Sequence, residues 1–146
     1  MTLFVACGKN KLLLFSVKEL AKEYSTSPVQ IVPFGFTPSI APYFQAADVV
    51  LGKAGPNMIF EAVACHKPFI ATTSIAGQEL GNLDLIKEFQ IGFVEEDTKK
   101  AAELVVAMNQ DPKIIEGLLP NIVKLANYNQ GTIDRLVAVM EKVGKD

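Results

Sequence analysis

The sequence predicts an α/β fold built on a doubly wound parallel sheet. Short apolar runs that are typical of buried strands alternate five times with segments of helical spacing, and helices alone complete the chain. The 146 residues are 49% apolar and 21% charged, a composition that supports one globular domain with a substantial core. We therefore expect about five strands, a Rossmann-like arrangement and ligands bound beyond the carboxyl ends of the strands.

The expected elements follow from hydrophobic spacing and from the residues that start or stop a helix. Asn10 can cap the first helix, Pro56 stands near the first position of the third, and Pro68 prevents that helix from continuing. Strands are expected at 2–7, 29–34, 49–51, 69–72 and 92–94. Helices are expected at 11–24, 39–46, 56–65, 82–89, 98–108, 111–127 and 132–143.

Charge and cysteine content exclude several classes of function. The formal net charge is −2, so the chain has no basic field for nucleic acid or anionic lipid. Cys7 and Cys65 stand in apolar surroundings, which favours buried free thiols over a disulfide and predicts a cytoplasmic location. The first residues lack the pattern of a signal peptide, and no apolar run approaches the roughly 18 residues of a membrane span.

Nucleophilic and metal catalysis find little support. His66 is the only histidine, so no zinc cluster can be built on histidines. It stands where a glycine commonly ends a helix, which favours a capping role over catalysis. Cys65 is favoured as a core thiol over a nucleophile. Because the sequence also lacks an Asp-x-Asp pair, we expect neither a metal nor another cofactor.

A first polar loop follows the expected third strand, in the stretch KAGPNMIFEA (53–62). Gly55 and Pro56 form a turn into a helix, and the backbone N–H groups of such a helix start suit a phosphate. Glu61, further along this helix, could accept hydrogen bonds from sugar hydroxyls. By itself the stretch favours a simpler interpretation, an ordinary strand–turn–helix connection with a solvated glutamate.

A second polar loop follows the expected fourth strand. Gln78, Glu79 and Asn82 are an amide, a carboxylate and an amide, which together can pair hydroxyls as donors and as acceptors. A solvated loop with Asn82 as a helix N-cap is an equally compatible interpretation. In the loop after the second strand, Phe36 could stack on a base, but a place in the core is favoured.

Taken together, these stretches resemble the donor-binding half of two-domain glycosyltransferases of the GT-B architecture. The matching segments are ACGKN (6–10), VPFGF (32–36), AADVVLGKAGPNMIFEA (46–62), KPFI (67–70) and AGQELGN (76–82). Within glycosyltransferase family 28, the chain is most similar to monogalactosyldiacylglycerol synthases and processive diacylglycerol glucosyltransferases. The paired KAGP…EA and GQELGN signals make the resemblance fairly specific.

The resemblance implies a UDP-sugar donor, transfer of a hexosyl group to a lipid acceptor, and no metal requirement. It places no catalytic residue in this chain. The residues that it assigns to donor binding are Gly35, Phe36, Gly55, Pro56, Asn57, Glu61, Gln78, Glu79 and Asn82.

These residues take separate roles by the same resemblance. Gly35 and Phe36 fall in the loop that holds the uracil. Residues 55–57 fall at the helix start that faces the diphosphate, and Glu61 matches the carboxylate that binds the ribose hydroxyls. Gln78 and Glu79 match the pair that meets the donor sugar, with Asn82 nearby.

The resemblance also implies that a first strand and a phosphate loop of the family domain are missing, so that residues 1–146 form a single incomplete nucleotide-sugar-binding domain. The acceptor-binding domain would lie on missing sequence or on another chain. We therefore expect inactivity alone, membrane association only through the missing part, and self-association through strand edges left unpaired. The other interpretation is a non-catalytic α/β interaction module that retains the scaffold.

Overall fold

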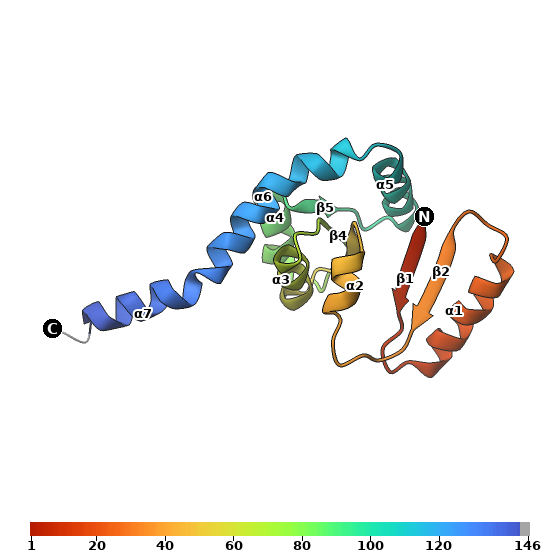
Figure 1. Ribbon diagram of the computed structural model, residues 1–146, viewed down its shortest axis with the longest axis horizontal. Helices are drawn as coiled ribbons and strands as arrows, with labels where there is room; N and C mark the ends of the chain where they lie inside the picture. The colour runs from red at the N-terminus through yellow and green to blue at the C-terminus, as the bar shows by residue number, and fades with distance from the viewer. Residues whose placement is uncertain (144–146) are drawn as a thin grey trace. The chain divides into compact units, whose positions relative to one another are not determined.

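The computed structural model describes residues 1–143 and confirms the predicted α/β class, with five strands and additional helices at the C-terminal end (Figure 1). Every strand pairing is parallel. The strands form two sheets, one of β1 and β2 and the other in the order β3-β4-β5. The chain divides between Tyr43 and Phe44 into a first unit and a second unit, and each is described by itself.

The element boundaries agree with the expected ones to within a few residues. The strands are β1 (Thr2–Ala6), β2 (Gln30–Phe34), β3 (Val50–Lys53), β4 (Phe69–Thr73) and β5 (Gly92–Val94). The helices are α1 (Lys11–Glu23), α2 (Ala41–Ala46), α3 (Pro56–Ala64), α4 (Leu80–Glu88), α5 (Thr98–Gln110), α6 (Lys113–Gln130) and α7 (Thr132–Val143). None of these helices combines the length and apolar character that a membrane crossing requires.

The first unit is a parallel β1–α1–β2 arrangement. Thr2 lies opposite Gln30 and Ala6 opposite Phe34, and α1 packs against β2. The expected cap of α1 is confirmed, because the Asn10 side-chain oxygen accepts the Leu13 N–H at 3.0 Å.

The second unit is organised around β4, the middle strand of its sheet. Phe69, Ile70 and Ala71 are all fully buried, as expected for a parallel strand that is covered on both faces. Phe69 lies opposite Val50 of β3 on one side and Gly92 of β5 on the other. The helices α3 and α4 connect these strands, and α6 packs against α3.

The capping role predicted for His66 is confirmed. His66 has a φ of 57°, in the left-handed region, directly after the last residue of α3 and its cap Cys65. The Lys67 N–H donates to the Ala62 carbonyl and the His66 N–H to the Val63 carbonyl, both at 2.9 Å. This pair of bonds is the Schellman motif, which satisfies the last carbonyls of the helix.

We expect His66→Gly to raise the free energy of unfolding by about 0.5–1 kcal/mol, because glycine adopts a positive φ without a steric cost. His66→Ala should instead lower it, since alanine keeps a Cβ atom and tolerates the left-handed conformation less well than histidine does. Urea unfolding followed by circular dichroism measures both changes. Equal stability of the glycine and alanine variants would contradict the capping role.

One edge of β1 has no strand partner among the described residues. β1 pairs only with β2, and β3 pairs only with β4, so these two strands share no neighbour. Leu3 and Phe4 of β1 are partly exposed. An unpaired apolar strand edge invites pairing with another chain.

We expect the protein to self-associate at micromolar concentration through the edge of β1. Leu3→Lys should shift sedimentation profiles toward the monomer, because a lysine on an edge strand opposes strand addition. Leu12→Lys is the matched control, since Leu12 is 81% exposed on α1 and is not part of the edge. A wild type that sediments as a monomer, or an equal effect of both variants, would show that the β1 edge is not responsible.

Candidate functional site

The carboxyl ends of β3 and β4 bring the two polar loops together. A register shift lies between Gly52 and Lys53, after which Lys53 stands opposite Thr73. The Ala54 N–H then donates to the Thr73 carbonyl at 2.9 Å. The loop that leads into α3 and the loop that leads into α4 therefore leave the sheet side by side.

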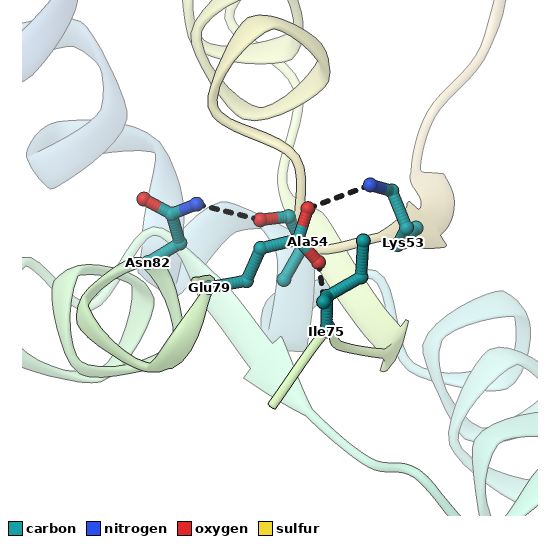
Figure 2. Close-up of polar contacts among 5 residues, drawn as sticks. All are labelled: Lys53, Ala54, Ile75, Glu79 and Asn82. Atoms are coloured by element: carbon teal, nitrogen blue, oxygen red, sulfur yellow. Dashed lines mark hydrogen bonds and ion pairs between the residues drawn. The ribbon is translucent and has the colours of Figure 1, made fainter. Parts of the chain in front are cut away.

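Two polar contacts join these loops and a third lies within the loop before α4 (Figure 2). The Lys53 ammonium lies 2.7 Å from Glu79 Oε1, and the other carboxylate oxygen of Glu79 accepts the Ile75 N–H at 2.8 Å. The Asn82 side-chain amide donates to the Ala54 carbonyl at 2.7 Å. Because the acceptor is a carbonyl, it must be the NH₂ group of Asn82 that faces Ala54.

Glu79 is a buried carboxylate, only 5% exposed. The hydrogen bond from Lys53 lowers the pKa of its side chain below the ordinary value, and the Ile75 N–H lowers the pKa further, while burial opposes both effects. The group therefore carries its negative charge at neutral pH. A charge in this position is stable because both oxygens have partners.

The start of α3 lies directly beside this cluster. Gly55 is the N-cap residue and Pro56 the first helical residue, as predicted. No side chain caps this end among the described residues, so the first N–H groups of the helix lack a side-chain acceptor. A Cβ atom at Gly55 would lie 3.8 Å from Glu79 Oε1, which places the carboxylate against the turn.

Three polar side chains of the expected donor-binding set reach solvent. Asn57 and Glu61 are exposed and four residues apart, so they share one face of α3. Gln78 is exposed in the second loop. Within residues 1–143, no side-chain hydrogen bond links Glu61 to that loop, and a single cleft lined by both stays a prediction.

Asn82 is not the helix N-cap that one interpretation of the sequence suggested. α4 begins at Leu80, and Glu79 occupies the cap position without a side-chain capping bond. The Asn82 side chain is directed back to the first loop instead, because the register of β3 and β4 places the Ala54 carbonyl within its reach.

The core position favoured for Phe36 is wrong. Its side chain is 65% exposed in the first unit, where it and Gly35 directly follow β2. The Lys9 ammonium lies 5.0 Å from the centre of the Phe36 ring, within the range of a cation–π contact. The ring therefore has an open aromatic surface.

Sequence reasoning gave no role to Lys53, although it belongs to the quoted KAGP segment. A signal was present, since a lysine at the end of a buried strand must place its charge near solvent or near a carboxylate. The partner, 26 residues away, was not identifiable because it depends on which strands are neighbours.

Comparisons with known proteins identify relatives of the chain. The model of the glycosyltransferase family 28 C-terminal domain matches residues 1–83, more than half of the chain. Monogalactosyldiacylglycerol synthase 3, chloroplastic, of Arabidopsis thaliana is 34% identical over 103 residues, which are 70% of this chain and 21% of that protein. Monogalactosyldiacylglycerol synthase, chloroplastic, of Spinacia oleracea is 36% identical over 103 residues, 70% of this chain and 19% of that protein. The chain thus spans about a fifth of the length of these curated relatives.

The cytoplasmic location expected from the sequence is contradicted by these relatives, whose names place them in the chloroplast. The two cysteines are free, as predicted, with Cys7 buried and Cys65 only half-buried. Free thiols indicate a reducing compartment, but that property does not distinguish the cytoplasm from the interior of an organelle.

Proposed function

The chain belongs to the glycosyltransferase family 28 C-terminal domain family, and on that premise we propose that it is the donor-binding portion of a UDP-sugar-dependent hexosyltransferase with a lipid acceptor. The names of the relatives, monogalactosyldiacylglycerol synthases, support a galactosyl donor and a diacylglycerol acceptor. Because the chain spans about a fifth of those proteins, we propose that transfer requires an acceptor-binding part and that this chain is inactive alone.

The observation that carries this proposal is the uncapped start of α3 beside the two joined loops. In the proposed complex, the helix start at residues 55–57 faces the diphosphate through the Asn57 N–H, because Pro56 has no N–H and that of Gly55 donates to the Lys53 carbonyl. The positive end of the helix dipole there stabilises charge on the leaving UDP. Preorganised backbone dipoles of this kind lower the energy of a transition state in which that charge develops. No metal is needed for the step in this proposal.

The remaining site residues bind the other parts of the donor. Glu61 accepts hydrogen bonds from the ribose hydroxyls, and the 78–82 loop meets the sugar. Within the first unit, the exposed aromatic ring of Phe36 can stack on a base.

Calorimetric titration of the full chain with UDP tests the proposal. We expect saturable binding that persists in EDTA, and a loss of about tenfold or more in affinity in Glu61→Ala, because charge-assisted hydrogen bonds to two hydroxyls disappear. Glu103→Ala is the matched control, since Glu103 is an exposed glutamate on α5 outside the site.

Each other outcome has a distinct meaning. Absence of UDP binding by the wild type would favour the non-catalytic interaction module. Binding that disappears in EDTA would contradict metal independence. Equal affinities of Glu61→Ala and Glu103→Ala would remove Glu61 from the site.

A further inference from the structure

The ion pair between Lys53 and Glu79 connects two segments that are separate in the sequence. Lys53 is the last residue of β3, and the register shift before it leaves Thr72 of β4 unpaired, so that Lys53 stands opposite Thr73. Its ammonium lies 2.7 Å from Glu79 Oε1, while about half of the lysine side chain remains exposed. The carboxylate is the buried partner, so its position depends on the cation more than the reverse.

The same carboxylate orders the loop between β4 and α4. Glu79 Oε2 accepts the Ile75 N–H at 2.8 Å, and the Gln78 N–H donates to the Ile75 carbonyl at 3.2 Å. At the start of the loop, the Ser74 hydroxyl donates to Glu96 Oε1 at 2.7 Å. The segment 75–78 is therefore held at one end by Ser74 and at the other by Glu79, which is itself held by Lys53.

The two neighbours Gln78 and Glu79 differ in what they can offer to a ligand. Both oxygens of Glu79 have protein partners and the side chain is buried, whereas Gln78 is exposed and its side chain makes no hydrogen bond within residues 1–143. An exposed amide on an ordered loop can bind a hydroxyl at a small entropic cost.

We propose that Lys53 is a positioning residue for the donor sugar, which acts by anchoring Glu79 and thereby presenting Gln78. This inference rests on the proposed function. It gives different roles to Gln78 and Glu79, which the family resemblance assigned jointly to the sugar. Glu79 is the anchor of the loop, and Gln78 alone of the two contacts the sugar hydroxyls.

The test compares the affinities of the full chain for UDP and for UDP-galactose or UDP-glucose by calorimetry, with amide hydrogen exchange at Ile75 as a second readout. In Lys53→Met we expect UDP affinity to stay within about twofold, and the affinity for the UDP-hexose to fall about tenfold, as loss of an ordered hydrogen bond predicts. Ile75 should exchange faster. Lys53→Arg should restore both, because a guanidinium also pairs with a carboxylate, and Lys99→Met on α5 should behave as the wild type.

A Glu79→Gln variant separates the anchor from a direct contact. If Glu79 is an anchor, Glu79→Gln and Lys53→Met should cause similar losses that are not additive in the double variant. Loss in Glu79→Gln alone would mean that Glu79 meets the sugar directly, and equal loss of UDP and UDP-hexose in Lys53→Met would mean that Lys53 binds the diphosphate. Either result would overturn the inference.

The two proposals can fail separately. A wild type that binds neither UDP nor UDP-hexose would remove the proposed function, while the exchange rate of Ile75 would still report whether Lys53 orders the loop. Unchanged Ile75 exchange in Lys53→Met would overturn the anchoring itself.

Discussion

An Ile59→Ala variant is expected to lose about 2–5 kcal/mol of unfolding free energy, through lost burial and the cavity left behind. Ile59 is 1% exposed and stands in the first turns of α3, which packs on β3, β4 and α6. Its N–H donates to the Gly55 carbonyl at 3.1 Å, the first bond of the helix. The side chain therefore fixes the start of α3 to the sheet. In Ile59→Ala, the affinity of the proposed diphosphate site for UDP should also fall.

Urea unfolding measures this loss as a lower midpoint at an unchanged m-value. Ile59→Val, which removes a single methylene, should cost about 0.5–1.5 kcal/mol. Phe60→Ala is a control on the exposed face of the same helix, where a larger truncation should cost less than Ile59→Ala. A Phe60→Ala variant that is the less stable of the two would show that α3 packs through its other face.

A Gly92→Ala variant is expected to destabilise the second unit by about 1–3 kcal/mol or more, because it forces β5 away from β4. A Cβ atom at Gly92 would lie 2.7 Å from the Phe69 carbonyl carbon and 2.8 Å from the Phe69 nitrogen. Both are backbone atoms of Phe69, a fully buried residue whose strand also pairs with β3 on its other side, so they cannot move aside.

A glycine-to-alanine substitution at Gly117 should instead stabilise the protein. Gly117 lies inside α6, and a Cβ atom there would meet nothing within 4 Å. Alanine is about 1 kcal/mol more favourable than glycine in a helix interior, so Gly117→Ala should raise the unfolding free energy. Thermal and urea unfolding of the two variants give both changes in unfolding free energy. If Gly117→Ala destabilised the protein, or if Gly92→Ala did not, the packing described for these strands and helices would be contradicted.

The helices and strands were predictable because their signals are local. Asn10 caps α1 as its place before an amphipathic segment predicts, and His66 ends α3 in the left-handed conformation that its position predicts. The strand β5 and the helix α7 have the predicted boundaries. In each case the deciding interaction joins residues within about one helical turn or repeats along one segment.

The candidate site was predictable only in part. The start of α3 at Pro56 follows from a local pattern, and the structure confirms it. The exposure of Phe36 and the direction of the Asn82 side chain were not predictable, because an aromatic or amide side chain in a loop takes its surroundings from other segments.

The sequence by itself determined the α/β class, the order of the elements, the caps of α1 and α3 and the two polar loops, since periodicity and capping act over a few residues. Only the tertiary structure decided that the five strands form two sheets and that Lys53 pairs with Glu79. Strand pairing joins residues that are distant in the chain, and its register is decided by competing long-range contacts. The Lys53–Glu79 pair spans 26 residues, and it exists because β3 and β4 are neighbours whose ends lie at one edge of the sheet.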